Sequence, residues 1–349
     1  MAQPASENLL SFAFPALTKR FPPGRLHPLA DREEERTGAW CREHLSWLLP
    51  HSGQMEAFLA DQCALVGLYT HPDALPDRIT PICDIYQFFG AVDNVLDNVD
   101  IADRGTPAIR AVVQQLLDSM RTGAGAAGDS LYAKEVTELV CRFHAHMSVA
   151  QRQRLQEALA EYVHGCAVED PLRTGNSDLD FATFIGIHLK SGTRALVQLM
   201  VEFGLGIDMT APLAACPALQ AAADASVKHC LLTNDLFSYR KEHFHGDATM
   251  NALTVFLRDG CHTLQQAVDR LCEQVHTAEE EFYTAQGEVL DSAVGQCPDV
   301  RAYLHGLEMF SAGFVCYGFT CGRYNGPGHR WNGVESGLMV LHPDRTEYR

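Results

Sequence analysis

The spacing of apolar positions along the chain predicts an almost wholly helical protein. Beyond residue 30, apolar side chains recur at intervals of three and four, and breaker-rich stretches separate the periodic segments. Few segments alternate as strands do. We expect helices at residues 31–49, 54–68, 78–100, 107–121, 131–148, 150–167, 178–206, 217–243, 249–258, 263–285 and 298–320. Several are long and apolar on more than one side, which is typical of a helical bundle whose inner helices surround a central cavity.

Proline and polar stretches predict the domain organisation. Residues 1–30 are rich in proline and phenylalanine, so we expect an extended N-terminal arm that caps the body rather than a helix. The clearest internal loops are expected at residues 122–130, 168–178 and 243–249. No linker or shift in composition divides residues 31–349, which we therefore interpret as a single all-α domain.

Charge and composition indicate which kinds of binding partner the protein is expected to lack. The 349 residues include 44 acidic and 27 basic side chains, and the net charge of −17 argues against a nucleic-acid surface or an anionic membrane. No apolar run approaches the roughly 18 residues of a membrane helix, and the first residues lack the pattern of a secretory signal. The 12 cysteines include no C-x-x-C pair, as expected for reduced, buried side chains. We expect a cytoplasmic protein without a nucleic-acid or membrane partner.

The nine-residue stretch NDLFSYRKE carries the clearest candidate chemistry. On a helix, Asn234, Ser238 and Glu242 lie at i, i+4 and i+8, near one face. Their side chains offer the oxygen ligands that Mg²⁺ prefers. Taken singly, each of these residues is more simply interpreted as part of a solvent-exposed helix face. The joint pattern is expected by chance in only about one chain per few thousand of this length, and the preceding apolar segment is typical of a buried helix. We therefore favour a metal-binding face on the floor of a cavity.

A second acidic pair lies on the helix expected at residues 78–100. Asp93 and Asp97 are four residues apart in the sequence DNVLD, and two carboxylates at this spacing repel each other unless a cation lies between them. Such a pair alone is common on solvated helices. We expect the neighbouring Asp84 and Asp100 to be surface residues.

The two motifs together resemble the metal-binding motifs of class I terpene cyclases (terpene synthases), in particular microbial and fungal members. The NDLFSYRKE stretch matches the second motif of that family. The resemblance implies the isoprenoid-synthase helical bundle, Mg²⁺ ligands at Asn234, Ser238 and Glu242, and a diphosphate contact from Lys241. It also implies three Mg²⁺ ions, for which Mn²⁺ can substitute.

The first motif departs from the family pattern. Asp93 occupies the leading position, where the family has an aspartate that bridges two ions, but Asn94 replaces the usual second aspartate. The resemblance gives Asp97 an outer or loosely bound role. This departure bears on the number of metal ions rather than on the class of protein.

A third region resembles the helix break and diphosphate sensor of the family. The position of the sensor arginine falls on His188, and Gly192 stands where the family has the helix-break glycine. A protonated His188 replaces the arginine, or Lys190 or Arg194 reaches the diphosphate, or the register differs. A core or surface histidine is the plain alternative.

Further residues are implied for the diphosphate and for the cavity. Arg323 and Tyr324 follow the last predicted helix and match the Arg–Tyr pair with which the family binds diphosphate, offering a planar fork and a hydroxyl donor. Aromatic candidates for cavity walls, where ring faces stabilise carbocations, are Phe88, Phe89, Phe184, Phe314 and Tyr317. An ordinary core position is the simpler reading of each of these rings.

The resemblance thus implies an enzyme that ionises and cyclises a linear isoprenoid diphosphate. Chain length and the single domain favour farnesyl diphosphate and a sesquiterpene product with release of diphosphate. A diterpene cyclase acting on geranylgeranyl diphosphate is the main alternative. A chain-elongating prenyltransferase would carry a second aspartate-rich run in place of NDLFSYRKE, and a non-catalytic helical scaffold is the plain alternative. Many relatives pair as dimers, so the resemblance leaves a homodimer open.

Overall fold

A computed structural model describes residues 10–49, 51–97, 131–174, 179–245, 248–325 and 337–341. Within these ranges the chain is mostly helical, which confirms the predicted all-α bundle. The elements in chain order are β1 Ser11–Ala13, α1 Ala30–His44, α2 Gln54–Ala60, α3 Ala64–Thr70, α4 Ile79–Asp97, α7 Leu131–His144, α8 Val149–Thr174, α9 Phe181–Ser191, α10 Arg194–Leu205, α11 Thr210–Ala215, α12 Pro217–His245, η1 Ala248–Met250, α13 Ala252–Arg258, α14 Leu264–Asp291, η2 Val294–Gln296, α15 Pro298–Thr320, α16 Gly322–Asn325 and β2 Leu338–Val340. The helix and the loop expected at residues 107–121 and 122–130 lie outside the described residues.

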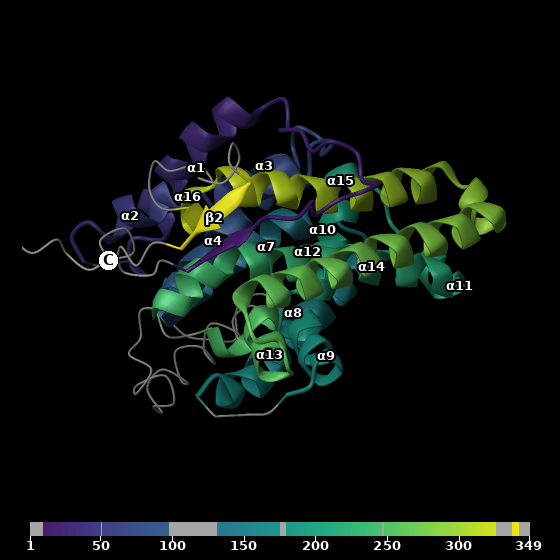
Figure 1. The fold of residues 1–349 in the computed structure, drawn as a ribbon. Coiled ribbons are helices and arrows are strands. Elements are labelled where there is room, and N and C mark those ends of the chain that lie inside the picture. Colours follow the sequence, from purple (N-terminus) through teal and green to yellow (C-terminus); the bar gives the residue numbers. More distant parts are fainter. Residues whose placement is uncertain are drawn as a thin grey trace, which may run out of the picture.

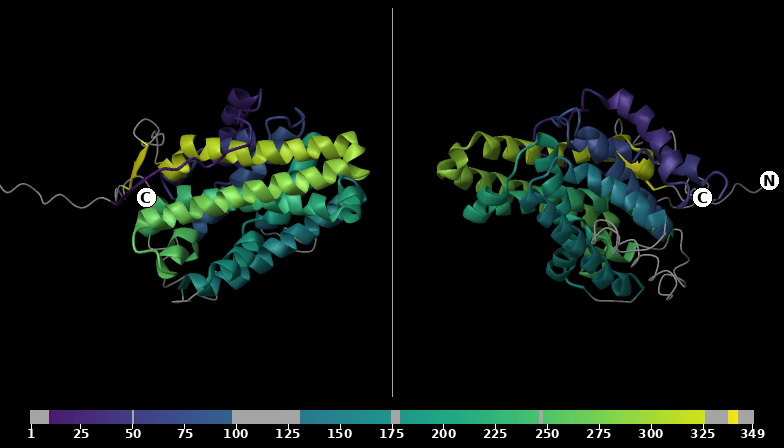
Figure 2. Two further views of the ribbon diagram at one scale, coloured as in Figure 1. Left: turned by 45° about the vertical axis from the view of Figure 1, so that its right-hand side comes forward. Right: turned by 180° about the vertical axis from the view of Figure 1, so that it is seen from behind.

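Helix α12 is the centre of the bundle. It packs against α14 and α15, which run along the length of the molecule (Figures 1 and 2). Between Ala225 and Arg240 every residue of α12 is buried except Lys228 and Asn234. A helix that is covered nearly all round can form only inside a bundle, so the packing of this segment determines where its polar end lies.

Most predicted helices match the structure, and the differences have physical causes. The segment expected at 178–206 divides at Gly192 and Thr193 into α9 and α10, and the segment expected at 54–68 divides into α2 and α3. The loop expected at 168–178 is wrong in its first half, because α8 continues through Pro171 to Thr174. Helix α8 packs extensively against α9, and this packing outweighs the weak helix propensity of the segment.

Residues 10–29 cross the bundle without forming a helix. Strand β1 pairs antiparallel with β2, with Ser11 opposite Val340. Further along, the buried carboxylate of Glu279 accepts backbone N–H groups of residues 19–21 at 2.7–3.1 Å. The two strands join segments from opposite ends of the chain, and Glu279 holds the N-terminal segment against α14. A capping role for this arm stays a prediction.

Asp84 is buried, so its predicted place on the surface is wrong. Its carboxylate lies 2.5 Å from Arg36 Nη2 on α1 and 2.7 Å from Arg142 Nη1 on α7. Arg36 also pairs with the buried Glu33 at 2.7 Å. A charged residue is expected at the surface when its partners are unknown. Here two guanidinium groups neutralise the buried Asp84 carboxylate, and their contacts connect α4 to α1 and α7. Asp100 lies outside the described residues.

The cysteines and the hydropathy of the described helices can be compared with the expectations from composition. The described cysteines are free thiols, and seven are buried, whereas Cys141 is exposed. None of the helices within the described ranges is long and apolar enough to cross a membrane.

We predict that Asp84→Ala lowers the free energy of unfolding by about 3 kcal/mol, because two guanidinium groups lose their buried partner. The matched control is Glu56→Ala, which removes the partner of Arg42 in an ion pair whose side chains are 53% and 68% exposed. This control should cost at most about 1 kcal/mol. Urea unfolding followed by circular dichroism measures the free energy of unfolding of both variants. Equal losses of stability in the two would contradict the structural role of Asp84.

Candidate metal and diphosphate site

The last turns of α12 change from apolar to polar and form the centre of the candidate site. Asn234 is partly exposed, Ser238 is buried, and Glu242 is partly exposed near the end of the helix. The Nδ2 atom of Asn234 donates a hydrogen bond to Tyr324 Oη at 2.5 Å. This contact uses the Nδ2 end of the amide and not its Oδ1 end. The structure thus brings Asn234 and Tyr324 together, as expected if both act at one site.

The hydroxyl of Ser238 provides a test of whether the residues fit a metal ion. Ser238 is 4% exposed, and within the described part of the chain its Oγ atom has no hydrogen-bond partner. An unsatisfied buried hydroxyl costs about 1–3 kcal/mol, so such groups usually have a ligand, an ion or a water molecule as partner. Asn234 and Glu242 lie one turn away on either side. The donor set of amide, hydroxyl and carboxylate therefore fits a hard divalent cation.

Asn251 and Asp235 support this face and were missed in the sequence. Asn251 Nδ2 donates to Glu242 Oε2 at 2.9 Å, and Asp235 Oδ2 accepts the backbone N–H of Ala252 at 3.2 Å. Both Asn251 and Asp235 are buried. An asparagine directly before the apolar run ALTVF is a helix N-cap signal, which indicates the start of α13 but not the contact with Glu242.

The Arg–Tyr pair lies on α16, a short helix that contacts α12. Arg323 and Tyr324 lie on α16, and the Tyr324 ring packs against Phe237 of α12 at a centroid distance of 6.2 Å. Burial raises the pKa of Tyr324 well above its usual range, so the hydroxyl stays protonated and can donate to an anionic oxygen. Arg323 Nη1 lies 3.7 Å from Asp61 Oδ2. Lys241, the other predicted diphosphate contact, is a partly exposed residue beside Glu242 on α12.

Of the three candidate sensors, His188 lies against the metal motif. Its Nε2 atom is 3.2 Å from Oδ1 of Asp235, the residue that follows Asn234. Lys190 is exposed. The guanidinium of Arg194 is held by carboxylates, including Asp224 at 2.8 Å. The geometry therefore favours His188 over the other two, and its contact with a diphosphate stays a prediction.

Gly192 ends α9 beside α12. A Cβ atom at this position would lie 2.5 Å from a methyl carbon of Leu231 and 2.7 Å from the backbone oxygen of His188. The next residue, Thr193, has φ of 60°, in the left-handed region that few side chains tolerate. The chain at the break between α9 and α10 therefore leaves little room for a side chain at Gly192.

The aromatic residues predicted for the cavity are mostly buried. Phe88, Phe184, Phe314 and Tyr317 are buried, and Phe89 is partly exposed with its ring edge-to-face against Tyr162 at 5.4 Å. Burial is expected both for cavity walls and for ordinary core residues. Their role as cavity walls stays a prediction.

The first metal motif lies at the end of α4. Asp93 and Asp97 belong to the last turns of this helix, but their side chains lie outside the described residues. Their metal-binding role stays a prediction.

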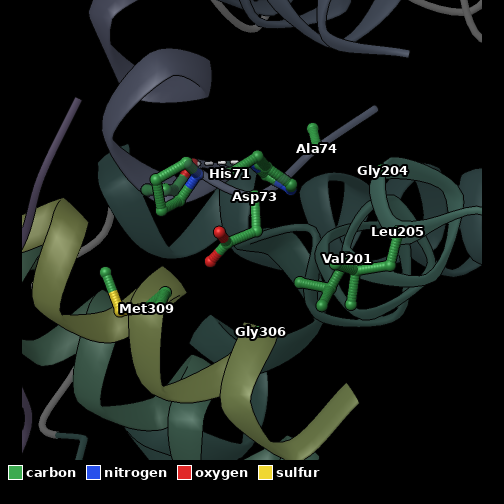
Figure 3. Close-up of a pocket in the computed structure, with 10 residues that line it drawn as sticks. His71, Asp73, Ala74, Val201, Gly204, Leu205, Gly306 and Met309 are labelled. Atoms are coloured by element: carbon green, nitrogen blue, oxygen red, sulfur yellow. Dashed lines mark hydrogen bonds between the residues drawn. The ribbon is translucent and has the colours of Figure 1, made fainter. Parts of the chain in front are cut away.

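A hollow elsewhere in the molecule involves none of the predicted site residues (Figure 3). It lies between the segment after α3, helix α10 and helix α15. His71 at its edge hydrogen-bonds Thr70 Oγ1 through Nδ1 at 2.8 Å, and burial lowers the pKa of His71 to about 3. His71 is therefore a neutral core histidine, and the carboxylate of Asp73 beside it is paired with Arg25.

Comparison with known proteins identifies a family model that covers most of the central part of the chain. A model of terpene synthase family 2, C-terminal metal binding, matches residues 84–281, more than half of the chain. Microbial terpene synthase-like protein 13 of Selaginella moellendorffii is 24% identical, over 86% of this chain and 84% of its own. Alpha-muurolene synthase of Coprinopsis cinerea is also 24% identical, over 92% of this chain and 75% of its own.

Solved structures share the fold at low identity. A variant of cucumene synthase superposes with a TM-score of 0.73 at 21% identity, over 88% of this chain and 100% of that one. Hedycaryol synthase superposes with a TM-score of 0.70 at 19% identity, over 88% of this chain and 98% of that one. The bundle is the isoprenoid-synthase fold.

The chain belongs to the terpene synthase family, whose members are lyases that act on isoprenyl diphosphates. The matched region is its metal-binding domain, which implies a divalent cation, and it contains both of the motifs discussed above.

We predict that Gly192→Ala lowers the free energy of unfolding by about 1–3 kcal/mol, because the new methyl group overlaps Leu231 and the α9 backbone. Gly186→Ala is the matched control on the same helix, since a Cβ there meets nothing within 4 Å. This control should be neutral or stabilising by up to about 1 kcal/mol, because alanine favours the helix. Denaturant unfolding distinguishes them, and a stable Gly192→Ala protein would contradict the close packing at the break.

Proposed function

We propose that this protein is a class I terpene synthase that binds Mg²⁺ through Asn234, Ser238 and Glu242 and cyclises farnesyl diphosphate. The observation that carries the proposal is the buried hydroxyl of Ser238, which lacks a partner within the described residues and lies between an amide and a carboxylate on one helix face. When bound, Mg²⁺ supplies charge neutralisation and Lewis acidity toward the diphosphate. Three ions, with Asp93 and Asp97 as ligands from α4, are part of the same proposal.

The proposed diphosphate contacts come from cationic and hydroxyl donors around this face. Arg323 and Lys241 offer positive charge, and the protonated Tyr324 offers a hydroxyl donor. His188, the diphosphate sensor of this proposal, is linked to α12 through Asp235. In an acidic chain, these donors stabilise the diphosphate as it leaves with the electron pair of the broken carbon–oxygen bond.

The remaining allylic cation needs a dry, apolar surface on which to fold. Buried rings such as Phe184 and Tyr317 can stabilise it by cation–π attraction, and exclusion of water prevents premature capture. Cyclisation then ends with loss of a proton or uptake of one water molecule.

Farnesyl diphosphate is favoured because several relatives bear sesquiterpene names. One of them, from Streptosporangium roseum, is a 4-epi-cubebol synthase described as cyclising (2E,6E)-farnesyl diphosphate, and it is 22% identical over 86% of this chain. Geranylgeranyl diphosphate is the alternative substrate. We place the activity in the cytoplasm, in keeping with the free cysteines among the described residues.

The direct test is incubation of the protein with Mg²⁺ and, separately, geranyl, farnesyl and geranylgeranyl diphosphate, followed by gas chromatography and mass spectrometry. We expect a cyclic C15 product from farnesyl diphosphate that disappears with EDTA. A cyclic C20 product from geranylgeranyl diphosphate alone would correct the substrate. Chain growth with added isopentenyl diphosphate would show a prenyltransferase, and no product from any substrate would refute the proposal.

We predict that Ser238→Ala separates activity from stability. Loss of the proposed ligand should lower turnover at least about 100-fold, more than the loss of a residue that only supports a ligand. Stability should be unchanged or higher by about 1 kcal/mol, because the variant removes a buried hydroxyl that lacks a partner among the described residues.

The matched control for this prediction is Ser226→Ala, about three turns earlier on α12. Ser226 is also buried, but its hydroxyl lies 3.0 Å from Leu307 O and 2.9 Å from Ser311 Oγ. This variant should lose about 1 kcal/mol of stability and keep its turnover. Turnover measured alongside thermal unfolding gives both quantities, and full activity in Ser238→Ala would exclude Ser238 as a ligand.

A further inference from the structure

Asn251 is a fully buried residue that joins the start of α13 to the end of α12. Its Oδ1 atom accepts the backbone N–H of Leu253 at 2.9 Å and so caps α13. Its Nδ2 atom donates to two acceptors on α12, the backbone oxygen of Asp235 at 2.8 Å and the Glu242 Oε2 atom at 2.9 Å. Both ends of the amide are therefore in use, and the side chain has a single orientation.

Asn251 and Asp235 connect α12 and α13 by hydrogen bonds in both directions. While Asn251 donates to the backbone of Asp235, the Asp235 carboxylate accepts the backbone N–H of Ala252 at 3.2 Å. The other oxygen of Asp235 lies 3.2 Å from His188 Nε2 on α9. This packing fixes the position of Asn251 relative to α12, so the direction in which its Nδ2 atom donates is fixed as well.

Glu242 is the residue that gains from this rigidity. It is partly exposed near the end of α12, where an unsupported glutamate would sample several rotamers and would lose side-chain entropy on binding an ion. A neutral donor at one carboxylate oxygen restricts these rotamers without cancelling the negative charge. Supporting contacts of this kind typically change metal affinity about 10–100-fold.

We propose that Asn251 is a positioning residue that holds the Glu242 carboxylate ready for a divalent cation. This inference rests on the proposed function, in which Glu242 is a metal ligand. The chemistry of asparagine suits the role, because aspartate would cap α13 but could not donate to Glu242. Serine would also cap α13, but its side chain is too short to keep the contact with Glu242.

The test measures binding rather than turnover. Isothermal titration calorimetry with Mg²⁺ in the presence of inorganic diphosphate is applied to the wild type, to Asn251→Ser and to Thr263→Ala. Thr263 caps α14 through the backbone N–H of Gln266 at 3.2 Å, so its variant removes a helix cap but leaves the contact between Asn251 and Glu242 in place. We expect Asn251→Ser to weaken apparent Mg²⁺ affinity about tenfold or more and Thr263→Ala to leave it unchanged.

A second readout separates positioning from a general loss of structure. If Asn251 only orients Glu242, raising the Mg²⁺ concentration should restore the turnover of Asn251→Ser, with little change in KM for the isoprenoid diphosphate at saturating metal. Wild-type affinity in Asn251→Ser would overturn the positioning role and leave the proposed function intact. Absence of Mg²⁺-dependent diphosphate binding in the wild type would overturn both.

Discussion

The structure depends on the burial of α12, a helix whose middle is covered on nearly every side while its end is polar. Burial is favourable for its apolar residues but costly for polar groups that lack partners. The polar residues of the motif meet this cost in different ways. Asp235 and Asn234 hydrogen-bond or pair with groups on other helices, and Glu242 accepts a hydrogen bond from Asn251. Ser238 is the member for which the described residues supply no partner, which makes this point of the helix suited to an added ligand.

Charged residues fix the elements around α12 in a similar way. Asp84 ties α4, the helix that also contains Asp93 and Asp97, to α1 and α7 through two guanidinium groups. Glu279 holds three consecutive backbone N–H groups of the N-terminal segment against α14. In both cases a buried carboxylate is stabilised by donors from a distant part of the chain. An acidic protein can therefore bury acids as structural connections, and acidity alone does not identify its functional carboxylates.

The sequence predicts those features that depend on local periodicity and fails for those that depend on distant partners. The helices at residues 217–243 and 298–320 are found because their apolar residues recur over many turns. Asp84 was assigned to the surface because its partners lie far away in the sequence, at Arg36 and Arg142. Asn251 could not be assigned a role beside Glu242, because only the fold brings the two together. The shared helix face of Asn234, Ser238 and Glu242 could be predicted from their spacing, whereas the burial of the Ser238 hydroxyl without a partner among the described residues could not.

The motif on α12 combines a structural face and a chemical face within one helix. Successive residues on a helix point about 100° apart, so Asn234 and Asp235 cannot serve the same surface. Asn234 faces Tyr324, and Ser238 and Glu242, four and eight residues later, lie on the same side of the helix. Asp235 turns instead toward α9 and α13, where it meets His188 and the backbone of Ala252. Asp235, the residue beside Asn234, thus fastens α12 to α9 and α13, so these contacts also fix the direction of the face that carries Asn234, Ser238 and Glu242.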